Sequence, residues 1–303
     1  MKVAHWAGLG LAVLSAASFA TSGVFAKGLF NAGWSPAAAA IWRITVGALV
    51  LLPFAVRELR GRWYLLRRHA LEILLFGVVA VVGCQLAYYL AVQQLSVAVA
   101  LLLEYCGVVL VVGWAWLRYG QKPGRLTVGG AGVAMVGLIL VLGIIGGGVV
   151  INPVGVGWGC VAALCVAAYF VIAAGKVDRR LPPVAFAASG LVVGVVALAL
   201  AGATGLVEVR WERADVTLLG TAIPWWGAVA ELGAIAAALA YLTGVAAAQR
   251  LGPTIASFVS LSEVLFAALW AWLLLAETPG PLQQFGGLLV LAGIVLVRWG
   301  AHE

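Results

Sequence analysis

Charged residues are scarce in this sequence. Of its 303 residues only 10% are Asp, Glu, Lys or Arg, whereas 64% are hydrophobic. A water-soluble domain typically has about a quarter charged residues and about half apolar ones. A chain this apolar cannot present a solvated surface, so the composition predicts a protein dissolved in lipid. It excludes a soluble enzyme, a disordered protein and a nucleic-acid-binding protein, despite a formal net charge of +7.

The sequence also lacks the motifs of common catalytic and metal sites. It contains no GxxxxGK(S/T) phosphate loop, no HExxH and no GxSxG, and its three histidines lie at the ends of apolar runs. The four cysteines lie inside apolar runs without a CxxC pair, which predicts buried free thiols: Cys84, Cys106, Cys160 and Cys165. We therefore expect no cofactor and no metal. The remaining alternative to a non-enzymatic protein is an intramembrane enzyme acting on a lipid or a small amphipathic substrate.

What the sequence does contain is long apolar runs. A bilayer core of about 30 Å needs about 20 residues per helix, and ten runs meet or approach this length. They are residues 6–26, 37–56, 71–92, 97–117, 126–145, 154–174, 184–203, 225–247, 254–275 and 282–299. The first run is longer than a typical signal-peptide core and is interrupted by Ser and Thr, so we interpret it as a retained helix. The prediction is an all-α membrane protein with ten transmembrane helices and a lipid bilayer as its surroundings.

The positions of the basic residues predict the orientation. If the N-terminus is cytoplasmic, most Lys and Arg fall in cytoplasmic segments, with a dense group in residues 57–68. Only Lys27, Arg210 and Arg213 fall on the opposite side. The positive-inside rule therefore predicts a multi-pass protein of the cell inner membrane with both termini in the cytoplasm.

An internal repeat relates the two halves of the chain. Residues 91–124 align with residues 247–280, and this pairs the segment 114–117 (WAWL) with 270–273 (WAWL) and Pro123-Gly124 with Pro279-Gly280. The same offset pairs Gly130 with Gly286 and Gly137 with Gly293. Five helices per repeat is an odd number, so the second repeat should enter the membrane inverted relative to the first. Inverted repeats are typical of secondary transporters, and gene duplication without transport is the alternative.

These segments resemble the drug/metabolite transporter (DMT) superfamily, EamA type. The resemblance is carried by residues 108–137 and 264–293, including the stretch 270–277 followed by Gly286 and Gly287. It implies two EamA-like repeats, residues 1–150 and 151–303, and export of amino acids, aromatic ones among them, or related small metabolites by alternating access. It also implies that helices 1, 3, 4, 6, 8 and 9 line the substrate site and that helices 5 and 10 support the interface, in a monomer or a homodimer. The sequence departs from the family pattern at Glu104, and at Gln121 where the second half has Glu277.

Four charged residues are the clear cases of charges deep inside predicted membrane helices, where each carries a free-energy cost and needs a reason. Arg43 and Glu104 should both lie about 10 Å below the outer boundary, so an ion pair between them is possible, and Glu231 competes as the partner. Arg43 either clamps the structure by binding carbonyls or a carboxylate, or attracts a substrate carboxylate. Glu104, Glu231 and Glu263 either bind a proton or a substrate ammonium, or lock helices together through hydrogen bonds.

Further polar side chains share helix faces with these charges and complete the predicted substrate site. Together they suit an amphipathic small molecule with an aromatic or apolar body and a charged end. They are Ser18, Ser22, Gln85, Tyr88, Tyr89, Tyr105, Tyr169, Tyr241 and Ser260. Glycines such as Gly190 and Gly194 are interpreted as helix-packing positions, and Trp34, Trp63, Trp211 and Trp299 as anchors at the membrane interface.

Overall fold

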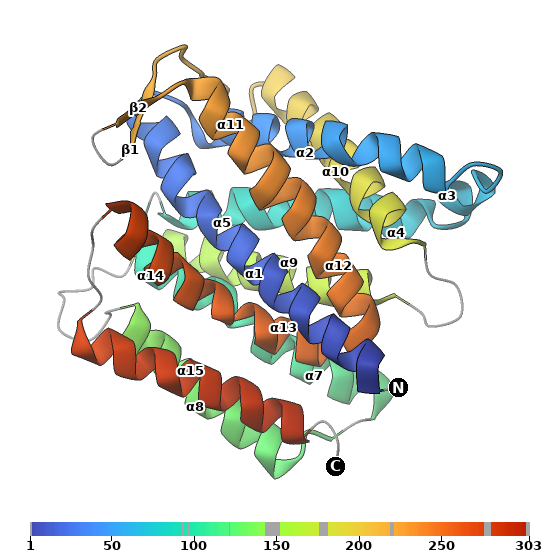
Figure 1. The fold of residues 1–303 in the computed structure, drawn as a ribbon, viewed down its shortest axis with the longest axis vertical. Helices are drawn as coiled ribbons and strands as arrows, with labels where there is room; N and C mark the ends of the chain where they lie inside the picture. Colours follow the sequence, from blue (N-terminus) through green and yellow to red (C-terminus); the bar gives the residue numbers. More distant parts are fainter. Residues whose placement is uncertain are drawn as a thin grey trace.

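The computed structural model describes residues 2–92, 94–95, 97–120, 122–142, 152–175, 181–218, 221–275 and 280–300. Within these residues nine helices are long and apolar enough to cross a membrane, and one further apolar helix, Arg125–Val141, is shorter. The helices pack together as a bundle (Figure 1). The prediction of an all-α membrane protein with ten helices is therefore confirmed.

Each of the first five predicted runs corresponds to a helix or to consecutive helical segments. The first two are α1 (Lys2–Asn31) and α2 (Pro36–Glu58), followed by the short α3 (Tyr64–Arg68). The third run comprises α4 (Ala70–Leu75), the π-helical segment η1 (Phe76–Gly83) and α5 (Cys84–Val92). The fourth comprises α6 (Val97–Tyr105) and α7 (Gly107–Tyr119), and the fifth is α8 (Arg125–Val141). The predicted end of the fifth run, at residue 145, lies outside the described residues.

Each of the second five predicted runs likewise corresponds to a helix or to consecutive helical segments. The sixth and seventh are α9 (Pro153–Ala174) and α10 (Pro183–Ala203). The eighth comprises α11 (Trp225–Gly233), the π-helical segment η3 (Ala234–Leu239) and α12 (Ala240–Leu251). The ninth comprises α13 (Pro253–Ser260) and α14 (Ser262–Leu275), and the tenth is α15 (Pro281–Gly300).

Helix ends fall at the predicted turn residues because those residues satisfy free backbone groups. Ser35 precedes Pro36 and accepts a hydrogen bond from the backbone N–H of Ala38 at 3.2 Å, and Asn152 caps α9 in the same way ahead of Pro153. Gly252, with φ of 78°, ends the eighth helix in a conformation that favours glycine. The first helix is longer than predicted, because α1 continues to Asn31.

Helices α8 and α15 pack antiparallel along their glycine faces, side by side at one edge of the bundle (Figure 1). A Cβ atom on Gly130 would meet the carbonyl oxygen of Gly293 at 2.9 Å, and one on Gly286 would meet that of Gly137 at 2.7 Å. Gly130 aligns with Gly286 and Gly137 with Gly293, so these two contacts are counterparts of each other. Small residues let the two backbones approach closely, as the sequence predicted for the glycines of helices 5 and 10.

A β-hairpin lies in the segment between the seventh and eighth helices, where the sequence indicated only a loop. Strands β1 (Val216–Leu218) and β2 (Thr221–Ile223) pair antiparallel, with Val216 opposite Ile223. The same segment covers Trp34, whose indole N–H donates to the carbonyl oxygen of Glu212 at 2.7 Å. Trp34 is only 3% exposed, so its interpretation as an interfacial anchor is wrong. It packs instead against the rings of Trp211 and Trp225.

The start of α1 and the end of α15 lie at the same end of the bundle, away from the hairpin (Figure 1). The guanidinium of Arg298 lies 4.4 Å from the ring centroid of Trp6, a cation–π contact that joins these two helix ends. The short α3, in the arginine-rich segment 57–68, lies at this end too (Figure 1).

The cysteines are free, as predicted, but they are not all buried. Cys165 is buried, Cys84 and Cys106 are intermediate, and Cys160 is exposed. The prediction of burial is wrong for Cys160, because an apolar run that spans a membrane turns one of its faces outward.

Candidate functional site

Arg43 lies in the interior of the bundle, where it binds a backbone carbonyl. Its side chain is 7% exposed, and its Nη2 donates to the carbonyl oxygen of Ala236 at 2.7 Å. Ala236 belongs to η3, where π-helical geometry replaces the regular α-helical hydrogen-bond pattern. The guanidinium also lies 5.7 Å from the ring centroid of Phe19. Of the two interpretations offered by the sequence, this contact is the structural clamp on a carbonyl.

Arg43 also lies near enough to Glu104, Glu231 and Glu263 to interact electrostatically with each of them. It makes no ion pair within the described part of the chain, although the sequence allowed one with Glu104 or Glu231. The guanidinium is held instead by the Ala236 carbonyl. Three predicted acids therefore surround Arg43, and within the described residues none of them forms an ion pair with it.

Glu104 and Glu263 flank interruptions in the fourth and ninth helices. Cys106 separates α6 from α7, and Leu261 separates α13 from α14. These two positions fall within one residue of each other when the halves of the chain are aligned. Glu104 lies on the N-terminal side of its interruption and Glu263 on the C-terminal side of the other.

Each of these two carboxyls accepts a hydrogen bond from a neutral group. The thiol of Cys84 donates to Oε1 of Glu104 at 3.1 Å, and the Tyr105 hydroxyl donates to the Glu263 carboxyl. Glu104 and Glu263 also interact electrostatically with each other. Both carboxyls thus belong to one cluster, formed by the third, fourth and ninth helices.

Glu231 joins the first and eighth helices. Its Oε1 accepts a hydrogen bond of 2.5 Å from the hydroxyl of Thr21 on α1. This contact is the helix-locking role that the sequence offered as one alternative, and it engages only one of the two carboxyl oxygens.

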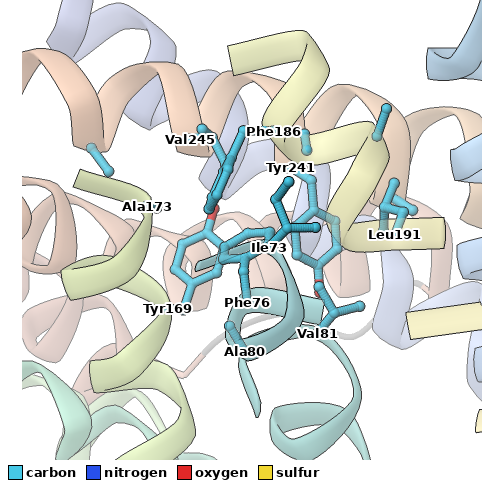
Figure 2. Close-up of a cluster of buried hydrophobic side chains, with 14 of the residues drawn as sticks. Ile73, Phe76, Ala80, Val81, Tyr169, Ala173, Phe186, Leu191, Tyr241 and Val245 are labelled. Atoms are coloured by element: carbon cyan, nitrogen blue, oxygen red, sulfur yellow. The ribbon is translucent and has the colours of Figure 1, made fainter. Parts of the chain in front are cut away.

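Aromatic rings form the apolar wall of the cluster. Figure 2 shows Phe76 among Tyr169, Phe186 and Tyr241, side chains contributed by the third, sixth, seventh and eighth helices. The ring centroid of Phe76 lies 5.5 Å from that of Tyr169 and 4.7 Å from that of Phe186. Phe19 extends this wall toward Arg43, with its ring 5.1 Å from that of Tyr241. Phe76 packs under Gly190, which confirms the packing role of that glycine.

Four buried polar atoms in this region have no hydrogen-bond partner among the residues that the structure describes: Arg43 Nε, Gln85 Oε1, Tyr169 Oη and Glu231 Oε2. Buried polar groups are nearly always satisfied, so each such atom calls for an explanation such as a water molecule or a ligand. All four residues belong to the predicted site. Together they offer a charged donor, a hydroxyl and two acceptors beside aromatic rings, which suits an amphipathic solute with polar groups at one end.

Two of the three predicted serines make hydrogen bonds within their own helices. The Ser18 hydroxyl donates to the carbonyl oxygen of Leu14, and the Ser260 hydroxyl to that of Ser257. Ser22 is partly buried. These contacts favour a packing role for Ser18 and Ser260 over ligand binding.

Of the two predicted tyrosines of the third helix, the structure describes the side chain of one. Tyr88 is partly buried and interacts electrostatically with Tyr105, whereas the side chain of Tyr89 lies outside the described set. Gln121 and Glu277, at which the halves differ, also lie outside the described residues.

The sequence did not single out Phe19, Phe76, Cys84 or Cys165 as site residues. Cys165 interacts electrostatically with both Cys84 and Glu104. The sequence offered one signal for Cys84, namely that it is adjacent to the predicted site residue Gln85. A lone cysteine in an apolar run, however, does not by itself indicate a binding site rather than a packed core. Among the described residues no group of three or more His, Cys, Asp and Glu side chains could hold a metal ion.

Comparisons with known proteins identify the family and the fold of the chain. The sequence model of the EamA-like transporter family matches residues 6–143 and 153–299. A protein of Salmonella typhimurium (strain LT2), named "Uncharacterized inner membrane transporter YicL", is 25% identical over 264 residues, which cover 84% of this chain and 82% of that protein. A crystal structure of another protein, 17% identical, has the same fold with a TM-score of 0.78 over 99% of each chain.

The apolar helices and the family match together define a polytopic membrane protein of the transporter class. The chain belongs to the EamA-like transporter family. This membership confirms the resemblance drawn from the sequence, and it indicates a transporter rather than the intramembrane enzyme that the sequence left as the alternative.

Proposed function

We propose that this chain is a secondary transporter of the cell inner membrane that exports amino acids, or related small amphipathic metabolites, by alternating access. The observation that carries the proposal is the set of four unpartnered polar atoms beside the aromatic wall, because they come from helices of both halves of the chain. In inverted-repeat transporters the substrate binds near the bilayer midplane, at the interface between the repeats.

Three features support two inverted repeats, residues 1–150 and 151–303. The glycine contacts of α8 are the counterparts of those of α15. The fourth and ninth helices are interrupted at aligned positions, and residues 78–83 of η1 align with the whole of η3. The family match also falls in two segments, one in each half. Rocking of one repeat against the other around the shared site would then expose it alternately to the two sides.

The amino-acid class follows from the polar groups of the site. The free Nε of Arg43 suits a carboxylate, and Glu104 with Glu263 suits an ammonium group. The rings of Phe19, Phe76, Tyr169 and Tyr241 suit an apolar or aromatic side chain. A substrate with these three parts is a zwitterionic amino acid with a hydrophobic side chain.

Further features support the proposed membrane, the orientation of the termini and the oligomeric state. The name of the Salmonella relative supports the inner membrane. The common position of the helix ends near Trp6 and Arg298, together with the arginines of residues 57–68, supports cytoplasmic termini. We propose a monomer as the transport unit, since the glycine faces of α8 and α15 are used within one chain.

A counterflow assay tests this function. The purified chain is reconstituted into liposomes loaded with one unlabelled amino acid at a time, and uptake of labelled phenylalanine is followed. We expect transient accumulation driven by hydrophobic amino acids and little accumulation driven by sugars or dicarboxylates. Accumulation driven only by the latter would reject the amino-acid assignment, and the absence of counterflow for all solutes would reject transport of these classes altogether.

A further inference from the structure

Exposed arginines gather where the chain passes from α2 through α3 to α4, at the end of the bundle that also holds the start of α1 (Figure 1). The five side chains are those of Arg57, Arg60, Arg62, Arg67 and Arg68. We propose that residues 54–75 form a binding site for an anionic phospholipid. The arginines bind its phosphate, and its acyl chains lie on the adjoining apolar surface. The proposal concerns a part of the chain that the transport function above does not use.

Helix α3 is held against the bundle by two leucines, while its first residues remain exposed. Leu65 and Leu66 are partly buried and pack against the core cluster of buried side chains that includes Phe76. Trp63 and Tyr64, which precede them, are 49% and 60% exposed. Exposed tryptophan and tyrosine side chains of membrane proteins are enriched at the level of the lipid headgroups. The packing of α3 therefore fixes an aromatic pair where a headgroup can reach it.

The arginines of this segment are not neutralised by acids of the same segment. It contains two acids, Glu58 and Glu72, and Oε2 of Glu72 already lies 2.8 Å from Nδ1 of His69. Among the described residues none of the five arginines forms an ion pair, although Arg62 Nη2 donates to the carbonyl oxygen of Glu58 at 2.8 Å. Guanidinium groups can bind phosphate oxygens through two parallel hydrogen bonds. The segment therefore has positive charge available for an anionic headgroup.

Exposed apolar side chains adjoin the arginines on both sides. Phe54 is exposed and lies three residues before Arg57 on α2, so the two share a face of that helix. Leu71 and Leu74 are exposed and share a face of α4, after the last arginine. A free phosphate ion would contact the arginines alone, whereas a phospholipid contacts both kinds of side chain. The continuity of basic, aromatic and apolar side chains therefore favours a lipid.

The opposite end of the bundle offers a matched comparison. Residues 208–215 also combine exposed arginines with a tryptophan, but they contain three acids and two arginines. Arg210 Nη1 lies 3.3 Å from Oε1 of Glu208, and the guanidinium of Arg213 lies 5.7 Å from the ring centroid of Trp211. This segment has no excess of positive charge, so we expect it to bind anionic lipids poorly.

Thermal unfolding with defined additives tests the site. The full chain in a neutral detergent is mixed with phosphatidylglycerol, with phosphatidylcholine of the same acyl chains, with glycerol 3-phosphate or with poly-glutamate. Unfolding is followed by tryptophan fluorescence. We expect phosphatidylglycerol to raise the unfolding temperature by about 3 °C or more, as a ligand present well above its Kd does. The other three additives should have little effect. Salt should reduce the shift, because it shortens the Debye length from about 10 Å at 0.1 M to about 3 Å at 1 M.

Variants assign the lipid to the arginine segment. The double variant Arg67→Gln and Arg68→Gln should lose about half of the lipid-induced shift or more, because each basic residue near the headgroups contributes a similar attraction. The double variant Arg210→Gln and Arg213→Gln removes the same charge at the opposite end and should keep the full shift. Each shift is measured against the same variant without lipid, so a change in intrinsic stability does not affect it. The comparison of lipids on the unmodified chain tests the proposal even if a variant fails to fold.

Several outcomes would overturn the lipid site. One is an equal shift with phosphatidylglycerol and phosphatidylcholine, and another is a full shift in the variant that lacks Arg67 and Arg68. A shift with glycerol 3-phosphate as large as that with the lipid would assign the segment to free anions. A shift of that size with poly-glutamate would assign it to an acidic protein. Either result would reject the phospholipid as the ligand.

Discussion

Gly137 of α8 and Gly286 of α15 lie in direct backbone contact. A Cβ atom on Gly137 would come within 2.6 Å of the carbonyl oxygen of Gly286, and one on Gly286 within 2.7 Å of the carbonyl oxygen of Gly137. The two helices can approach this closely only because neither position has a side chain. Because the contact is between the backbones of the two helices, no flexible side chain could move aside to admit a larger residue.

Leucine in place of Gly137 should therefore force α8 and α15 apart. Overpacking typically costs about 1–3 kcal/mol, so we expect Gly137→Leu to lower the unfolding temperature by about 5 °C or more. The measurement is thermal unfolding in detergent followed by tryptophan fluorescence. Gly129→Leu is the control, because a Cβ on Gly129 meets nothing within 4 Å. If both substitutions lowered the unfolding temperature equally, the close contact between α8 and α15 at Gly137 would be contradicted.

Ser35, at the start of α2, is hydrogen-bonded to the segment between α10 and α11, which also contains the β-hairpin. Its hydroxyl donates to the carbonyl oxygen of Glu208 at 2.8 Å and accepts from the N–H of Arg210 at 3.0 Å. Loss of these bonds leaves a partly buried carbonyl and a partly buried N–H without their partner, at a cost of about 1 kcal/mol or more. We therefore expect Ser35→Ala to speed tryptic cleavage after Arg210 about tenfold or more.

The control for Ser35 is Ser189→Ala, which removes a hydroxyl bonded only to the carbonyl oxygen of Ala185 in its own helix. Its cleavage rate should match that of the unmodified chain. A rate unchanged by Ser35→Ala would show that the segment is held by other contacts, such as the Trp34 cluster.

Arg43 has one nitrogen bound to Ala236 and another, Nε, that has no partner in the described part of the chain. Lysine keeps the charge but lacks the fork that can bind two acceptors in fixed directions. We expect Arg43→Lys to weaken binding of phenylalanine about tenfold and to leave binding of 2-phenylethylamine, which has no carboxylate, nearly unchanged. Calorimetric titration measures both. Equal losses for the two ligands would instead mean that Arg43 only clamps the π-helical segment.

The inverted arrangement predicts opposite sides for two exposed segments. With the native cysteines replaced by serine, a cysteine introduced by Arg60→Cys should react with a membrane-impermeant maleimide only after the cytoplasmic side is opened. One introduced by Arg213→Cys should react in intact cells. Labelling of both positions from the same side would reject the inverted repeats.

Much of the fold could be predicted from the sequence because the bilayer sets strict requirements. Spans need about 20 apolar residues, and turn residues such as Ser35-Pro36 and Asn152-Pro153 mark where they begin. The interior charges were recognisable for the same reason: Arg43, Glu104 and Glu263 are costly in lipid and had to find one another or a ligand.

The partners of these charges could not be predicted. Arg43 binds the carbonyl of Ala236, which is available to it within a π-helical segment, and the apolar sequence of that segment does not distinguish π from α geometry. The burial of Trp34 depends on a segment more than 170 residues away in the chain, which makes a hydrogen bond with its indole. Local patterns carry no information about such distant contacts.

The π-helical segments η1 and η3 also bear on how this sequence tolerates changes in length. A π turn accommodates a residue beyond those of a regular α-helical turn. Deleting one residue within Phe76–Gly83 or Ala234–Leu239 should convert the segment to α-helix and leave the helix beyond it near its present orientation, because the deleted residue is the one that the π turn absorbs. Such a deletion would keep Gln85 or Tyr241 on its present side of the helix, whereas the same deletion in a regular α-helical stretch would rotate everything beyond it by about 100°. Single-residue gaps among relatives should therefore be tolerated at these two segments more readily than elsewhere in the spans.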